Sequence, residues 1–253
     1  MKRLLYVLLI LAPFSLFGKT QQNAELLFQA ANKYYTEGNY AEAIKNYEAI
    51  ISMGKTSAEL YFNLGNAYFK LSDIAHAILN YERAYLLNPS DDDIAFNLEL
   101  ARAYTTDKIE AIPDFFMVKW VKSISSLFSS NAWAFIAITS FFIALMLFMI
   151  FQFSGKYLIK KYAFIISWFS VFLFIVSITF SISQKNRIVN SNHAIVTSTA
   201  ISVKSSPSEN SNDLFILHAG TKVETLRNVG EWCEIRIADG NKGWLPKSAF
   251  EKI

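Results

Sequence analysis

The sequence contains little cysteine, little histidine and no catalytic signature motif. Its 253 residues include one cysteine, Cys233, and three histidines. A single cysteine excludes an intrachain disulfide framework. The histidines, His76, His193 and His218, do not share the spacing of zinc ligands. Because a phosphate-binding loop, a nucleophile elbow and an HExxH motif are also missing, we expect no metal site, no cofactor and no enzymatic activity.

Charged residues are scarce as well, at 18% of the chain, whereas hydrophobic residues reach 53% and phenylalanine alone occurs 22 times. The apolar residues are concentrated in a few long runs, which favours membrane spans over a wholly soluble protein. The net charge is +3, but the excess basic residues flank the apolar runs instead of forming a patch. A nucleic-acid-binding function is therefore excluded.

The first residues have the pattern of a secretory signal. Lys2 and Arg3 precede an apolar run, and the small residues Ser15 and Gly18 follow near its end. This pattern predicts a signal peptide over residues 1–18. The alternative is a signal anchor that is not cleaved. Both alternatives predict that the chain after this segment is exported.

Two later apolar segments, 132–153 and 162–182, are each long enough to cross a bilayer. The loop between them, 154–161, carries three lysines and is expected to lie in the cytoplasm. The domains on both sides would then lie outside the cytoplasm, as the signal segment also predicts. Because neither segment contains an ionisable side chain, we interpret the pair as an anchoring hairpin and not as a transport path.

A short amphipathic segment, 114–128, precedes the first span. Lys119 and Lys122 fall on one helical face, while Phe116, Trp120 and other apolar residues cover much of the rest. This pattern is typical of a helix that lies in the membrane interface. A helix that caps the preceding domain would show the same pattern, and the sequence does not decide between the two.

A 34-residue period runs through residues 24–110. The copy at 58–91 resembles the tetratricopeptide repeat in its signature positions, which are Leu64, Gly65, Tyr68, Ala77, Tyr81, Ala84 and Pro89. The preceding copy is looser, and a third copy fades after its first helix. The resemblance implies stacked helix pairs with a concave groove that binds peptides or proteins.

The first helix of each repeat is expected to face that groove. Phe28, Phe62 and Phe96 share one repeat position, and Asn32 and Asn66 share another. The predicted partner-binding residues are Phe28, Asn32, Tyr35, Phe62, Asn66, Phe69 and Phe96. The basic residues of a carboxylate clamp are missing, so an extended peptide is the expected ligand. The alternative is that the phenylalanines only pack between repeats.

Residues 192–253 alternate apolar and polar residues between glycine-containing turns. The stretches Gly220-Thr221-Lys222-Val223 and Asp239-Gly240-Asn241-Lys242-Gly243-Trp244 resemble bacterial SH3 domains. Cys233 falls in a predicted strand, which favours a structural role over a reactive thiol. The resemblance implies a small all-β barrel that binds peptides, cell-wall material or other domains.

The order of these parts, with the segment Asn97 to Pro113, resembles the BatE-like proteins of the Bacteroides aerotolerance family. The resemblance implies a multidomain membrane protein with a tetratricopeptide-repeat solenoid, a two-helix transmembrane hairpin and an SH3-like barrel. It also implies an inner-membrane protein with periplasmic domains, which acts as a scaffold with a MoxR-type ATPase and von Willebrand A-domain proteins. The alternative function is an envelope sensor that binds cell-wall material through the SH3-like domain.

Overall fold

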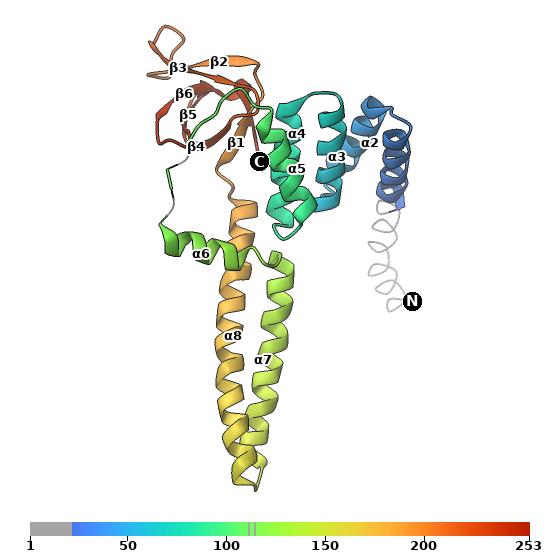
Figure 1. Cartoon of the computed structure of the whole chain (residues 1–253), viewed down its shortest axis with the longest axis vertical. Helices are drawn as coiled ribbons and strands as arrows, with labels where there is room; N and C mark the ends of the chain where they lie inside the picture. The colour runs from blue at the N-terminus through green and yellow to red at the C-terminus, as the bar shows by residue number, and fades with distance from the viewer. Residues whose placement is uncertain (1–21, 111, 114) are drawn as a thin grey trace, which may run out of the picture. The chain divides into compact units, whose positions relative to one another are not determined.

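The computed structural model describes residues 22–110, 112–113 and 115–253 (Figure 1). The predicted signal segment 1–18 lies outside the described residues. The chain divides into two units. The repeat–sheet unit comprises the described residues up to Ala84, residues 93–110 and Asn192–Ile253, and the hairpin unit comprises Tyr85–Asp92 and the described part of Ile112–Ser191.

Antiparallel helix pairs form the first part of the repeat–sheet unit. An unlabelled helix over residues 22–36 is followed by α2 (Tyr40–Ser52), α3 (Ala58–Lys70), α4 (Ile74–Leu87) and α5 (Asp92–Ala103). Local sequence sets these boundaries. The Ser57 hydroxyl caps α3 by accepting a hydrogen bond from the Leu60 N–H at 3.0 Å. Gly54 adopts a φ of +72° directly after α2, a conformation that favours glycine.

The spacing within a helix pair depends on small residues. A Cβ atom built on Gly65 of α3 would lie 2.7 Å from the ring of Tyr81 in α4. Tyr81 and Ala77 are both fully buried, so the ring has little room to move away. The combination of a small residue and a large one at these repeat positions therefore fixes how closely α3 and α4 approach.

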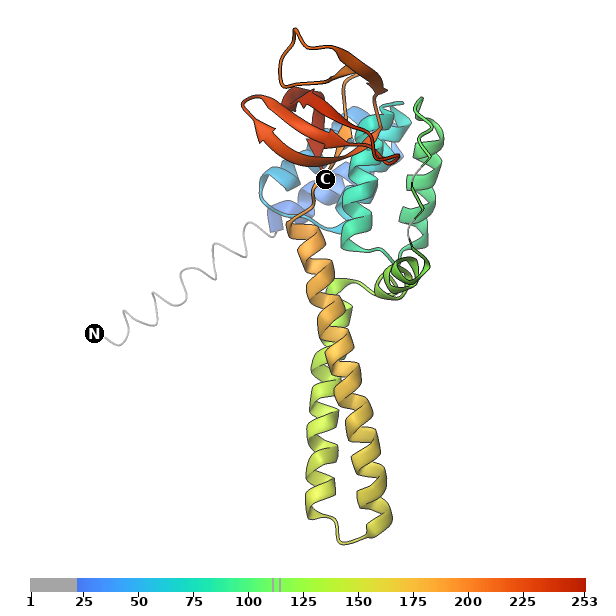
Figure 2. The same cartoon turned by 90° about the vertical axis from the view of Figure 1, so that its left-hand side faces the viewer.

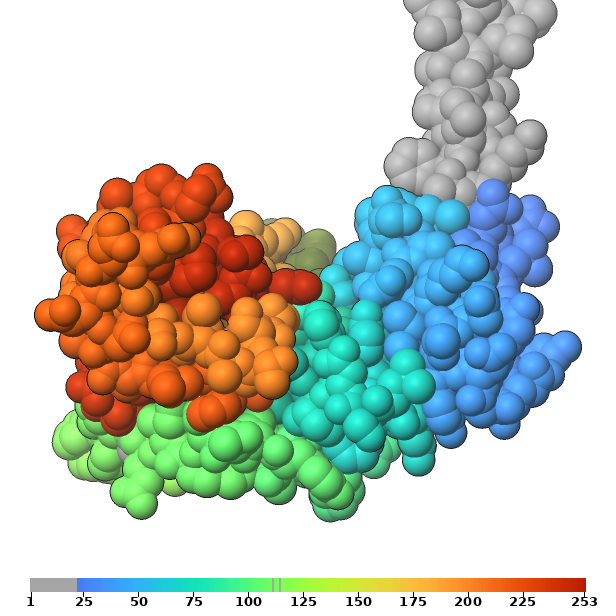
Figure 3. Space-filling view, turned by 90° about the horizontal axis from the view of Figure 1, so that it is seen from above, coloured from blue at the N-terminus to red at the C-terminus, as the bar shows by residue number. Residues whose placement is uncertain are grey.

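The C-terminal part of the same unit is a seven-stranded sheet in the order β3-β2-β6-β5-β4-β1-β7. Each strand pairs antiparallel with its neighbours. The strands are β1 (His193–Val196), β2 (Ala200–Lys204), β3 (Asp213–His218), β4 (Lys222–Val229), β5 (Trp232–Arg236), β6 (Lys242–Pro246) and β7 (Phe250–Lys252). Alternate residues such as Val203, Leu217 and Ile235 form one buried core. Figure 3 shows this sheet beside α4.

The hairpin unit contains α6 (Phe116–Ser125), α7 (Ser130–Phe153) and α8 (Tyr157–Val189). The last two pack against each other along their length (Figure 2). Their contact face is small or polar and includes Ala137, Ser140, Ser170 and Ser177, whereas most large apolar side chains point outward. Both helices are long and apolar enough to cross a membrane. Helix α8 extends beyond the apolar stretch 162–182 at both ends.

The predicted fold class is confirmed. The structure contains a helical repeat region, two long apolar helices and a C-terminal antiparallel sheet, which is open at its β3 and β7 edges. Each of these parts follows from a pattern in the sequence. The pattern is a 34-residue period for the repeats, an unbroken apolar run for each span and the alternation of apolar and polar residues for the strands.

Candidate functional site

Two equivalent hydrogen bonds mark the face that was predicted to bind a ligand. In the first repeat the Tyr47 hydroxyl donates to Asn32 Oδ1 at 2.6 Å, and in the second the Tyr81 hydroxyl donates to Asn66 Oδ1 at 2.7 Å. Each asparagine lies on the first helix of its pair, and each tyrosine lies on the second. The repeated asparagine therefore has a structural task that the sequence pattern alone did not show.

The predicted phenylalanines pack beside these tyrosines. The ring centroids of Phe28 and Tyr47 are 5.9 Å apart, and those of Phe62 and Tyr81 are also 5.9 Å apart. Phe28 and Phe62 are both half-buried. These rings thus stabilise the helix pairs while part of each remains accessible to a ligand.

The other predicted aromatic residues are distributed along the same helices. Phe69 makes an edge contact with Tyr104, and Tyr35 makes one with Tyr40. Phe96, on α5, is 67% exposed.

A pocket of about 140 Å³ lies between the two repeats. Its lining residues are Asn32, Tyr35, Thr36, Tyr47, Asn63 and Asn66. Three of the predicted groove residues, Asn32, Tyr35 and Asn66, therefore share one pocket. The four predicted phenylalanines do not line it, and Asn63 is a lining residue that the sequence reasoning missed.

The two tyrosine hydroxyls that hold the pocket asparagines stay neutral. Burial raises the pKa of Tyr47 to about 12, with smaller contributions from Tyr35 and Glu59, so its hydroxyl keeps its proton. Burial also raises the pKa of Tyr81. Because both hydroxyls donate to the asparagine oxygens, the amide nitrogens of Asn32 and Asn66 remain available, and neither donates a hydrogen bond to another described residue. Such donors suit a peptide carbonyl oxygen.

A second polar site joins the repeats to the sheet. Glu82 of α4 is 3% exposed and accepts hydrogen bonds from Arg102 of α5 at 2.6 Å and from Lys222 of β4 at 2.7 Å. Burial alone would raise the pKa of Glu82, but the two cations together hold it below its ordinary value. The carboxylate is thus charged, buried and paired with both a helix and a strand.

Asp107, in the segment after α5, forms a second link to the sheet. It accepts hydrogen bonds from the backbone N–H of His218 at 2.8 Å and from the hydroxyl of Thr221 at 2.6 Å, and it contacts His218 Nδ1 at 2.7 Å. Burial alone would raise the pKa of Asp107, but these hydrogen bonds hold it below its ordinary value. Nearby Ile109 packs against the core of the sheet.

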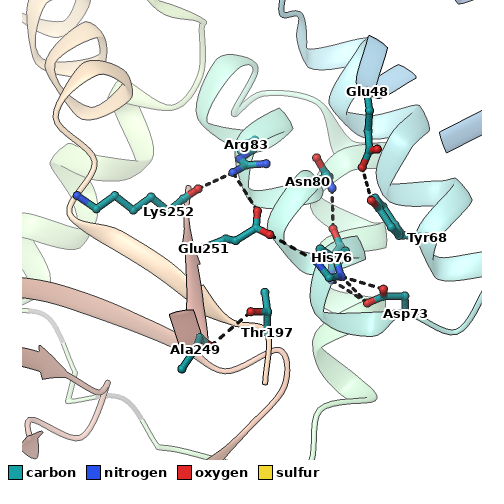
Figure 4. A network of polar contacts seen from close by, with 10 residues as sticks. All are labelled: Glu48, Tyr68, Asp73, His76, Asn80, Arg83, Thr197, Ala249, Glu251 and Lys252. Atoms are coloured by element: carbon teal, nitrogen blue, oxygen red, sulfur yellow. Dashed lines mark hydrogen bonds and ion pairs between the residues drawn. The ribbon is translucent and has the colours of Figure 1, made fainter. Parts of the chain in front are cut away.

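Figure 4 shows a third link, at β7. Arg83 of α4 donates to the carbonyl oxygen of Lys252 at 2.6 Å and lies 3.8 Å from the carboxylate of Glu251. The same carboxylate lies 3.6 Å from Nε2 of His76. We call the contacts of Glu82, Asp107 and Arg83 the docking network. It holds the repeats and the sheet together within one unit.

No sequence pattern indicates the docking network. Glu82 occupies the same repeat position as Glu48, which is exposed. An acidic residue on a helix surface normally indicates a solvated face. The packing of α5 and of the sheet against α4 buries Glu82, so the repeat pattern alone cannot reveal it.

A cleft of about 540 Å³ lies along β3 of the sheet. Its walls include Lys108 of the segment after α5, Leu214 and Ile216 of β3, Asp239 of the β5–β6 turn and Lys242 of β6. Leu214 and Ile216 are exposed. The cleft therefore combines apolar walls with charges of both signs at its rim.

Cys233 is buried in the sheet core, and burial raises the pKa of its thiol. Among the described residues, no group of three or more histidine, cysteine or acidic side chains is placed to hold a metal ion.

Comparison with known families identifies three segments. Residues 31–72 match the TPR repeat family, residues 58–91 match the tetratricopeptide repeat, and residues 199–251 match the bacterial SH3 domain. No curated protein matches the chain. The first match spans the end of the helix over residues 22–36 together with α2 and α3, and the second spans α3 and α4. The third covers the sheet except β1 and the end of β7.

These modules are typically non-catalytic binding domains. Together they indicate a role in protein interaction and cell-wall binding, and the two long apolar helices indicate a membrane protein.

Proposed function

We propose that this protein is a membrane-anchored scaffold that captures an extended polypeptide in the pocket between its repeats. The observation that carries the proposal is the pair of asparagine amides, Asn32 and Asn66, which line one pocket with their oxygens already occupied by tyrosine hydroxyls. The free amide nitrogens can donate to successive carbonyl groups of a peptide backbone. The half-buried phenylalanines beside them, Phe28 and Phe62, would contact its side chains.

The location that we propose is the inner membrane, with the repeats and the sheet in the periplasm. The lysines of the loop 154–161 and the signal segment 1–18 support this topology. In a Cys233→Ser background, an impermeant thiol reagent should label a cysteine at Ser208 in cells with a permeabilised outer membrane. It should not label one at Lys160. If the reagent labelled Lys160→Cys but not Ser208→Cys, the proposed topology would be wrong.

We further propose that the partners include membrane proteins of a BatE-like system, namely von Willebrand A-domain proteins that act with a MoxR-type ATPase. The support is the order of modules along the chain, which resembles that family. In this proposal the protein has no enzymatic activity and supports envelope maintenance or stress tolerance. Loss of the gene should then disturb the assembly of these membrane partners without removing a reaction product.

The pocket is tested best by substitutions that keep its internal hydrogen bonds. Asn66→Ala would leave the buried Tyr81 hydroxyl without its acceptor and would cost stability. Asn66→Asp keeps the acceptor oxygen and removes the amide donor, as Asn32→Asp does in the first repeat. We expect the double variant to stay folded and to capture its partner about tenfold more weakly, because two hydrogen bonds are lost.

The measurement is photo-crosslinking in intact cells from an unnatural residue at Thr36, which lines the pocket. Asn46→Asp is the matched control, because the Asn46 amide donates to the carbonyl oxygen of Glu42 in its own helix and lies outside the pocket. The control should leave the crosslinks unchanged. If the folded double variant also forms the same crosslinks at the same intensity, the pocket is not the binding site.

A second candidate function is an envelope sensor that binds cell-wall material. The cleft along β3, with Lys242 and Asp239 at its rim, favours it. Co-sedimentation of the full protein with purified cell-wall sacculi measures this binding directly. Lys242→Glu should weaken the binding if the cleft is the site, whereas the pocket variants Asn32→Asp and Asn66→Asp should not affect it.

A further inference from the structure

The helix α6 exposes an apolar face that nothing in the described structure covers. Phe116 is 70% exposed and Trp120 is 67% exposed. At 100° per residue, Met117, Val121 and Ile124 project from the same side of the helix as these two aromatic residues. A face of this size is costly in water, so it requires an apolar surrounding.

The opposite side of α6 is polar. Lys119 and Lys122 lie there within one turn of each other, and both are exposed. The helix is therefore amphipathic along its whole length. Lysine stems of this kind can reach past an apolar boundary toward water or anionic head groups.

The end of α6 is fixed to the start of the hairpin. The Trp133 indole N–H donates to the carbonyl oxygen of Ser125 at 2.9 Å. Gln184 of α8 donates to the carbonyl oxygen of Phe128 at 2.9 Å and also bonds to that of Ser125. These contacts come from both long helices, so the corner between α6 and α7 is held in one geometry.

The same corner marks one end of the apolar hairpin. Ser130 and Ser181 exchange two hydrogen bonds of 3.0 Å across α7 and α8 at this level. The charged residues Lys185 and Arg187 follow on α8 directly afterwards. The change from uncharged to charged sequence places the edge of the hydrocarbon layer near this corner. Figure 1 shows α6 lying crosswise to α7 and α8 there, and Figure 2 views it nearly end-on.

We infer that α6 lies in the interfacial layer of the bilayer, with its phenylalanine and tryptophan side chains among the upper acyl chains and its lysines at the head groups. This inference rests on the proposed membrane anchorage of the hairpin. The occupant of the apolar face is lipid because α6 is fixed to α7 and α8 at the level where the uncharged part of the hairpin ends. Aromatic residues are enriched at this depth in membranes. The helix would hold the hairpin at a defined depth and tilt.

The test uses the full chain in lipid nanodiscs, in a Cys233→Ser background with single cysteines that carry an environment-sensitive fluorophore. Trp120→Cys reports on the apolar face, and Lys119→Cys is the matched neighbour on the polar face. Phe142→Cys, in the middle of α7 and 61% exposed there in the native protein, reports on the membrane interior. Quenching is measured with lipids that carry a nitroxide near the head group or deep in the acyl chain.

We expect the label at Trp120 to be quenched more strongly by the shallow nitroxide than by the deep one, and about twofold more than the label at Lys119. The label at Phe142 should be quenched mainly by the deep nitroxide. Because Trp120→Cys removes one anchoring side chain, Val121→Cys provides a second reporter on the same face, and the same depth is expected.

Two negative outcomes are distinguishable. If Phe142 is quenched while Trp120 and Val121 are not, the hairpin spans the membrane but α6 does not lie on it, and the inference is overturned. A protein partner would then cover the helix. If Phe142 is not quenched by either lipid, the membrane anchorage itself fails and the inference fails with it.

Discussion

Replacing Glu82 by glutamine would test whether the docking network holds the repeats and the sheet together. The substitution keeps the shape of the side chain but removes the charge that pairs with Arg102 and Lys222. A hydrogen bond to a charged group contributes about 1.5–3 kcal/mol. The side chains of the two cations are 41% and 37% exposed, so water can partly solvate them when the carboxylate charge is removed. We therefore expect the free energy of unfolding to fall by about 2–4 kcal/mol. This is less than the loss expected when one partner is removed from a fully buried pair.

The assay is thermal unfolding of the full chain in detergent, combined with hydrogen exchange in α5 and β4. For a unit of this size the loss corresponds to a decrease in Tm on the order of 10 °C. Glu99→Gln is the matched control, because Glu99 contacts the same Arg102 at 3.6 Å but is 71% exposed. An exposed pair of this kind contributes less than about 1 kcal/mol. Equal effects of the two variants would refute the argument that burial makes Glu82 important.

The same variant has a defined pH dependence. The pKa of Glu82 in the folded protein is lowered from its ordinary value of 4.5. A lowered carboxylate pKa contributes stability that is present above the unfolded pKa and is lost as pH falls through the folded pKa. The difference in the free energy of unfolding between the native protein and Glu82→Gln should therefore be constant from about pH 6 to 8. It should shrink below pH 4.5. A difference that grew on acidification would contradict the assigned sign.

Three further predictions concern other contacts. Asp107→Ala should release the segment after α5 from the sheet. Hydrogen exchange at the end of β3 should then rise, and the segment should become sensitive to protease. Unchanged protection from exchange would show that Asp107 does not hold the segment on the sheet. Gly65→Ala should destabilise the second repeat by about 1–3 kcal/mol, because the new methyl group meets the ring of Tyr81 at 2.7 Å. Gly155→Ala, which meets nothing within 4 Å, should leave the unfolding curve unchanged. Cys233→Ser should preserve function in cells, since the thiol is buried and its pKa is raised; loss of function at a normal protein level would argue for a chemical role.

The repeat region shows how far a candidate site can be predicted from sequence. The 34-residue period correctly placed Asn32 and Asn66 at equivalent positions, and both line the pocket. It did not show that Tyr47 and Tyr81 occupy the two asparagine oxygens, because each bond joins residues on different helices. It also did not reveal Asn63, although Gln29 and Asn97 occupy the equivalent positions, because only the fold shows that this helix position lines the pocket.

The sequence by itself determined the elements of this protein. A repeat period, two uncharged apolar runs and an alternating C-terminal segment each predict one type of structure, because local geometry dictates the spacing of buried residues. Only the tertiary structure decided which surfaces those elements share. Glu82 and Asp107 look like ordinary surface acids in the sequence. In the structure they are buried or hydrogen-bonded because Lys222, Thr221 and His218, which lie more than a hundred residues away in the chain, contact them. Contacts between distant segments depend on how complete domains fit together, and no local pattern encodes that fit.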